Sequence, residues 1–147
     1  MSIADDIING QLPNIEQHLQ QGESLDDIDE YGFTALIECA IVANVEAAQL
    51  LLARNVEVDK TDVTGRTALH WATDNKNIEL TKLLLAKGAN PNSYNRGGQS
   101  VLVYPLLREH WLIKQTLYQS GASLDFALDF INAKLIGHRF ELSGDVD

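Results

Sequence analysis

Cysteine is nearly absent from this chain of 147 residues, which contains Cys39 alone. A single cysteine excludes an internal disulfide and is typical of a reducing compartment such as the cytoplasm or nucleus. The four histidines are scattered, at His18, His70, His110 and His138, and no cysteine pair accompanies them. The sequence therefore predicts no metal centre and no cofactor.

Long apolar runs are also absent, although 45% of the residues are hydrophobic. Stretches such as Leu50 to Ala53 are far too short to cross a bilayer. Residues 1–10 contain Asp5 and Asp6 and no basic residue, unlike a secretory signal peptide. Gly97 and Gly98 are not followed by Lys-Ser or Lys-Thr, as in a phosphate-binding loop. We expect a protein that binds no membrane and no nucleotide.

Basic residues are scarce in the first part of the chain. Residues 1–59 contain twelve acidic residues and one basic residue, whereas residues 60–147 contain nine acidic and ten basic ones. The net charge of −10 disfavours binding to nucleic acid. The acidic part either keeps the protein soluble or forms a docking face for a basic partner.

The sequence contains a pattern that repeats every 33 residues: YGFTALIECA from Tyr31, TGRTALHWAT from Thr64 and GGQSVLVYPL from Gly97. A period of this length is typical of stacked repeat proteins. Equivalent positions of the repeats carry residues of the same kind. They are glycines at Gly32, Gly65 and Gly98; hydroxyl side chains at Thr34, Thr67 and Ser100; leucines at Leu36, Leu69 and Leu102; and residues that tolerate a left-handed backbone at Asn55, Gly88 and Gly121.

The pattern within each repeat predicts a turn followed by two helices. The first glycine allows a positive φ in the turn, and Thr34, Thr67 or Ser100 then caps the first helix. Gly88 or Gly121 ends the second helix in a left-handed conformation. In the last repeat, Pro105 cannot donate a hydrogen bond to the carbonyl of Val101, so we expect a kinked or late-starting helix. The irregularity is either tolerated there or shapes a binding surface.

Residues 64–92, TGRTALHWAT…NKNIELTKLLLAKGANPN, resemble the ankyrin repeat, G-x-T-P-L-H-x-A-A…N-G-x-x-E-x-V-x-x-L-L-x-x-G-A-x-x-N. The motif proline is replaced by Ala35, Ala68 and Val101, and only His70 keeps the motif histidine. The resemblance implies an all-α solenoid in which His70 bridges neighbouring hairpins. The expected repeats are 1–28, 29–61, 62–94 and 95–125, followed by a capping helix and the start of a truncated C-terminal region at 126–147.

Catalysis by this chain is not expected. Cys39, His70 and a carboxylate would suit a cysteine hydrolase. However, Cys39 occupies the small position that Ala72 fills in the next repeat, which indicates a buried packing thiol. No catalytic residue is predicted.

In the ankyrin family, partners contact hairpin tips and exposed positions of the first helices. Transfer of these positions predicts the following partner-binding residues: Glu30, Tyr31, Phe33, Ile41, Val42, Val63, Arg66, Asp74, Asn75, Arg96, Gln99 and Arg108. Trp71 and Tyr104 either pack or form an aromatic platform, and Glu38 at the same repeat position marks a polar spot. The predicted function is protein binding, by a monomer.

The segment FINAKLIGHRFELSGDVD is similar to the segment that follows ankyrin repeats in some effector proteins that intracellular bacteria deliver into host cells. This resemblance implies a module that binds a host protein and reaches the host cell without a classical signal peptide. The alternative is a scaffold fragment of a larger enzyme, such as a cysteine-protease-like effector, with its catalytic domain beyond Asp147.

Overall fold

The structure is a computed structural model that describes residues 2–142, so the last residues of the expected C-terminal region lie outside the described part. The described residues form helices and loops, with one isolated β-bridge between Tyr94 and Ser100. The helices are α1 (Ile3–Ile8), α2 (Leu12–Gln21), α3 (Ala35–Val42), α4 (Val45–Leu52), α5 (Ala68–Asp74), α6 (Ile78–Ala86), α7 (Val103–Leu107), α8 (Trp111–Gln119) and α9 (Leu124–Leu142).

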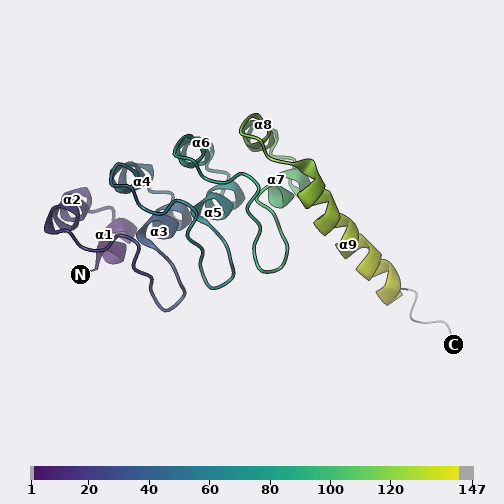
Figure 1. Ribbon diagram of the computed structural model, residues 1–147, viewed down its shortest axis with the longest axis horizontal. Helices are drawn as coiled ribbons and strands as arrows, with labels where there is room; N and C mark the ends of the chain where they lie inside the picture. Colours follow the sequence, from purple (N-terminus) through teal and green to yellow (C-terminus); the bar gives the residue numbers. More distant parts are fainter. Residues whose placement is uncertain (1, 143–147) are drawn as a thin grey trace.

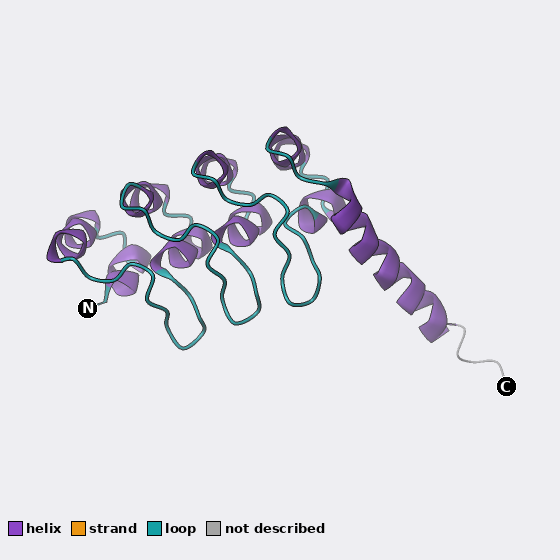
Figure 2. Ribbon diagram, in the orientation of Figure 1, coloured by secondary structure: helices purple, strands orange, loops and turns teal. Residues whose placement is uncertain are grey.

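The first eight helices form pairs that stack side by side in two rows (Figure 1). Helices α1, α3, α5 and α7 contact one another in one row, and α2, α4, α6 and α8 do so in the other. The loops between successive pairs project from one side of the stack (Figure 2). This arrangement is the all-α solenoid that the repeat period predicts.

Equivalent leucines from each repeat form one core that runs along the stack. Leu69 and Leu102 of the first-helix segments are buried, as are Leu51, Leu84 and Leu117 of the second helices. Cys39 is also fully buried, as its alignment with small residues predicts. Because each repeat shares its core with its neighbours, stability depends on contacts between repeats.

The predicted caps are confirmed for two first helices and wrong for the third. Thr34 Oγ1 accepts a hydrogen bond from the backbone N–H of Ile37, and Thr67 Oγ1 accepts one from His70. Ser100 does not cap α7, because this helix begins later, at Val103.

Pro105 explains the late start of α7. Proline has no N–H to donate to the carbonyl of Val101, so the regular helical bonds begin with the bond from Leu106 N to Leu102 O, at 3.0 Å. Pro105 thus lies in the first turn of α7, where proline is tolerated. The hydroxyl of Ser100 is buried without a hydrogen-bond partner among the described residues.

The loops 29–33, 62–66 and 95–99, here called the second, third and fourth hairpin loops after their repeats, stack on one another. Each is closed by a backbone bond between its first and last residues, and Arg96 N donates to Thr64 O of the preceding hairpin loop at 2.9 Å. Gly65 has a φ of 81°, and a Cβ there would lie 2.8 Å from Arg96 N. Glycine is therefore required both for the turn and for the close approach.

Helix α9 follows the last pair and points away from the stack (Figure 1). The capping helix expected within residues 126–147 is present, although it begins slightly earlier, at Leu124. Ala127 is fully buried and α9 contacts α7, as expected of a cap. Leu128, Leu135 and Ile136 remain exposed.

Candidate functional site

Five of the side chains near the second and third hairpin loops form a continuous group, called here the aromatic–arginine cluster: Tyr31, Phe33, Arg66, Trp71 and Asp74. The rings of Tyr31 and Phe33 lie 5.8 Å apart, and Phe33 meets Trp71 edge to face at 6.0 Å. The guanidinium of Arg66 lies 4.1 Å from the centre of the Trp71 ring and pairs with the carboxylate of Asp74. The cluster thus joins two repeats.

Asp62 holds this cluster in place. Its Oδ1 atom accepts hydrogen bonds from the backbone N–H groups of Thr64 and Arg66, at 2.8 and 3.1 Å, and Oδ2 accepts one from Trp71 Nε1 at 3.1 Å. Burial raises the pKa of Asp62, but the hydrogen bond from the Thr64 hydroxyl, at 2.6 Å, and these donors outweigh it and hold the pKa below its usual value. Asp62 is therefore an ionised anchor for both the hairpin loop and the indole.

The aromatic side chains of the cluster are only partly covered. Tyr31 is 57% exposed, whereas Phe33 and Trp71 are half-buried. Val63, at the tip of the third hairpin loop, is exposed as well. Large aromatic side chains held rigidly at a surface are typical anchors of protein interfaces.

Arg66 is already engaged within the chain. It stacks on Trp71 and pairs with Asp74, and its Nε atom is buried without a hydrogen-bond partner among the described residues. Burial raises the pKa of Asp74 to about 6, although the positive charges of Arg66 and Arg108 oppose this effect. The pair therefore positions the indole at some electrostatic cost.

The other predicted partner-binding residues lie around the cluster or in the next repeat. Asn75 Nδ2 donates to the carbonyl of Ala40 at 3.2 Å, so this side chain links two repeats. Arg108 lies 4.9 Å from the ring centre of Tyr104. The side chains of Glu30, Val42 and Arg96 are exposed, and those of Ile41 and Gln99 are half-buried.

His70 bridges the third and fourth hairpin loops, as the resemblance implies. Its Nδ1 atom accepts a hydrogen bond from Thr67 N at 3.1 Å, which leaves the proton on Nε2. Nε2 donates to the carbonyl of Gln99 at 3.3 Å. Burial lowers the pKa of His70 to about 4, so the imidazole is neutral at physiological pH.

Cys39 is not a candidate nucleophile. Burial raises the pKa of its thiol to about 12, with the negative charge of Glu38 adding to the effect. A thiolate is the reactive form of cysteine, and it is not populated at neutral pH with such a pKa. The thiol serves as a packing group in the core of α3.

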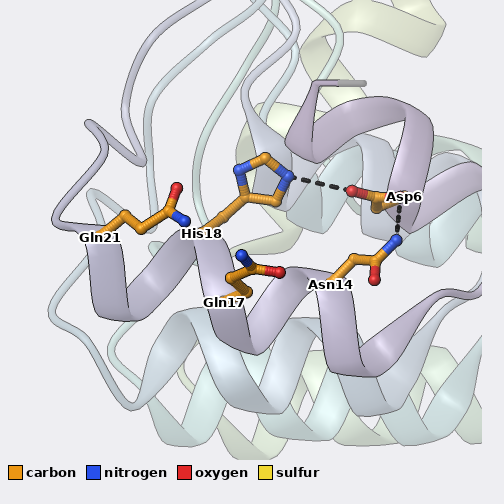
Figure 3. A pocket seen from close by; sticks show the side chains of 5 residues that line it. All are labelled: Asp6, Asn14, Gln17, His18 and Gln21. Atoms are coloured by element: carbon orange, nitrogen blue, oxygen red, sulfur yellow. Dashed lines mark hydrogen bonds and ion pairs between the residues drawn. The ribbon is translucent and has the colours of Figure 1, made fainter.

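A pocket of about 290 Å³ lies between α1 and α2 and is lined by polar residues (Figure 3). His18 Nε2 bonds to Asp6 Oδ2 at 3.0 Å, and its Nδ1 bonds to Glu23 Oε2 at 2.8 Å. Asn14 Nδ2 also donates to Asp6, at 3.0 Å. The hydrogen bond to Asp6 raises the pKa of His18, outweighing burial, and the one to Glu23 adds to this effect. With both ring nitrogens occupied, His18 is a structural link rather than a general base.

Within residues 2–142, no helix is long and apolar enough to cross a bilayer. The same residues contain no group of three or more His, Cys, Asp or Glu side chains arranged to hold a metal ion.

Sequence analysis missed Asp29 and Asp62, which organise the hairpin loops. Asp29 Oδ1 accepts from the backbone N–H groups of Tyr31 and Phe33, at 2.9 and 2.8 Å, and Asn95 has the same role in the fourth repeat. The three residues stand 33 apart, each three residues before the turn glycine. This spacing was the available signal, because Asp and Asn at such positions favour turns.

The family comparison agrees with this geometry. Residues 3–95 match the model for ankyrin repeats in three copies. The chain belongs to the ankyrin-repeat family, whose repeats mediate protein–protein interactions and are typically non-catalytic.

Among solved structures, the chain is similar to one described as the Legionella effector AnkH, with 63% sequence identity and a TM-score of 0.90. The similarity covers 96% of this chain and 31% of that one, so this chain spans about a third of the length of that relative. The search of curated proteins finds no match.

Proposed function

We propose that this chain is the partner-binding module of a bacterial effector, and that it binds a host protein through the aromatic–arginine cluster and the adjoining hairpin tips. The observation that carries the proposal is the continuous row of Tyr31, Phe33 and Trp71 across two repeats, with Tyr31 57% exposed. A rigid aromatic row at a surface provides apolar contact area at little entropic cost. The similarity to an effector supports the host cell as its place of action.

The roles of the cluster residues differ. Tyr31, Phe33 and Val63 offer side-chain surface to the partner, whereas Arg66 and Asp74 fix the orientation of Trp71. Arg96 and Arg108 add positive charge in the fourth repeat, beyond the acidic second repeat. The partner then meets opposite charges at the two ends of one surface, which favours a single orientation.

The test is quantitative affinity purification from a eukaryotic cell lysate with the native chain and with the double variant Tyr31→Ala/Phe33→Ala. The matched control is Leu112→Ala/Tyr118→Ala, which removes two exposed apolar side chains from α8. We expect a partner that is enriched by the native chain and by the control, and lost with the cluster variant. Retention of every partner by a folded cluster variant would overturn the proposal.

A further inference from the structure

One position of the repeat is a carboxylate in the second repeat and an aromatic side chain in the third and fourth. Glu38, Trp71 and Tyr104 stand 33 residues apart on successive first helices. In the third repeat, Trp71 donates to the second oxygen of the turn residue Asp62. The second repeat instead has a carboxylate, Glu38, at the position of this donor, and its own turn residue is Asp29. Asp29 and Glu38 are here called the acidic pair. They stand where the third repeat has an acid, Asp62, and a hydrogen-bond donor, Trp71.

The turn residue Asp29 uses only part of its hydrogen-bonding capacity. Its Oδ1 atom accepts from two backbone N–H groups, as the equivalent atom of Asp62 does. In Asp62 the other oxygen, Oδ2, accepts from the indole of Trp71. No indole is available to Asp29, because Glu38 occupies that position.

The Glu38 side chain is largely covered, and its carboxylate has no hydrogen-bond partner within the described part of the chain. Only 9% of the residue is exposed, and its carboxylate makes no hydrogen bond or ion pair with any described residue. Burial raises the pKa of Glu38, and the negative charge of Asp29 raises it further, which places the two carboxylates within electrostatic reach of each other. A largely covered carboxylate without a partner gains from pairing with a cation, so this position favours a positively charged ligand group.

The basic residues of the neighbouring segments are occupied elsewhere. Arg66, in the next hairpin loop, pairs with Asp74 and stacks on Trp71. Arg54 is the one basic residue among residues 1–59, and its guanidinium donates to the carbonyl of Leu19 at 3.4 Å. Neither arginine therefore supplies a cation to the acidic pair, and the described residues show no ion pair to Asp29 or Glu38.

The surroundings of the acidic pair suit an organic cation. Tyr31 and Phe33 belong to the same hairpin loop as Asp29, and Asp29 holds their backbone N–H groups. An ammonium or guanidinium group near an aromatic face gains cation–π attraction in addition to its attraction to carboxylates. The net charge of residues 1–59 draws a basic segment toward this end of the molecule.

We propose that Asp29 and Glu38, together with the rings of Tyr31 and Phe33, bind a lysine or arginine side chain of the protein partner. This inference rests on the proposed function, because it assigns the chemistry that the second repeat recognises. Binding of the cation would neutralise the unpaired charge of Glu38, which makes that charge a specificity determinant for a basic partner.

The test begins with selection from a phage-displayed library of random peptides on the native chain. The selected peptide is then synthesised with its basic residue intact, exchanged between lysine and arginine, or replaced by glutamine. Calorimetry measures each peptide against the native chain, Glu38→Gln and the control Glu46→Gln, which removes an exposed acid from α4. The exchange of lysine and arginine shows which of the two groups the site prefers.

We expect selected peptides to share one basic position, whose replacement by glutamine weakens binding to the native chain and to Glu46→Gln about tenfold or more. Glu38→Gln should discriminate less between the basic and glutamine peptides, because only Asp29 and the two rings remain to attract the cation. Glu38→Gln removes a carboxylate that has no hydrogen-bond partner among the described residues, so the variant should fold at least as stably as the native chain, and circular dichroism checks this.

Two results would overturn the inference and leave the proposed function in place. One is a set of selected peptides without a basic position whose binding is still lost with Tyr31→Ala/Phe33→Ala. The other is an equal loss of affinity for the glutamine peptide in the native chain and in Glu38→Gln. Failure to select any peptide, or peptides that bind Tyr31→Ala/Phe33→Ala unchanged, contradicts both the inference and the proposed function.

Discussion

At the scale of single residues, two histidines should give the stability of this protein opposite responses to pH. The pKa of His70 falls to about 4 because of burial. Between pH 6.5 and 4 the unfolded chain therefore binds a proton that the folded chain does not. This difference lowers the free energy of unfolding by about 2 kcal/mol at pH 5 relative to pH 8.

His18 should act in the other direction. Its hydrogen bond to Asp6 raises its pKa against the opposing effect of burial, and the hydrogen bond to Glu23 adds to the rise. The folded chain therefore keeps a proton that the unfolded chain loses above pH 6.5. The resulting stabilisation is complete below pH 6.5 and disappears as the pH rises through the folded pKa of His18.

Proton NMR titration of the two imidazole rings measures both effects in one sample. We expect a midpoint near pH 4 for His70 and one above 6.5 for His18. Urea unfolding of the native chain and of His70→Gln from pH 8 to pH 5 checks the energetic consequence. Midpoints near 6.5 for both rings would contradict the hydrogen-bond assignments.

At the scale of helices, equivalent capping positions should differ in energy. Thr67 caps α5, so Thr67→Ala should lower the free energy of unfolding by about 1 kcal/mol. The hydroxyl of Ser100 caps no helix and is buried without a partner among the described residues. Ser100→Ala should therefore be neutral or stabilising. Urea unfolding of the two variants measures this difference. Equal losses in the free energy of unfolding would indicate that Ser100 acts as a cap after all.

Replacing the turn glycine by alanine should also cost a different amount of free energy in different hairpin loops. Gly65 and Gly98 both have positive φ, so alanine is strained at either position, by about 1 kcal/mol. A Cβ at Gly65 would also meet Arg96 N at 2.8 Å, whereas one at Gly98 has no atom within 4 Å. We expect Gly65→Ala to cost about 3 kcal/mol and Gly98→Ala about 1 kcal/mol in thermal unfolding. Similar costs would argue against close stacking of the hairpin loops.

The sequence predicts these elements well wherever local chemistry decides their geometry. The period of 33 residues predicts the helix pairs, and Thr34, Gly32 and Asn55 take the predicted capping or left-handed roles. Ser100 has the composition of a cap, but Pro105, five residues later, moves the start of α7. Repeat alignment therefore overstated the regularity of the fourth repeat.

At the scale of the whole molecule, the candidate site was less predictable than the fold. Tyr31 and Phe33 could be singled out because exposed aromatic residues at turn tips are unusual. The pairing of Arg66 with Asp74 and the isolation of Glu38 depend on how successive repeats stack. Such contacts between repeats follow from three-dimensional register, which a motif of one repeat does not contain.

The shared core leads to a last prediction about how the molecule unfolds. Leu84 is fully buried in α6, which contacts α4, α5 and α8. Leu84→Ala should lower the free energy of unfolding by about 2–5 kcal/mol, because it removes apolar contacts and leaves a cavity. Hydrogen exchange should accelerate most in α5 to α8 and least in α1 and α2, since neighbouring repeats carry the coupling. An equal acceleration in all helices would instead indicate that the described repeats unfold as a single cooperative unit.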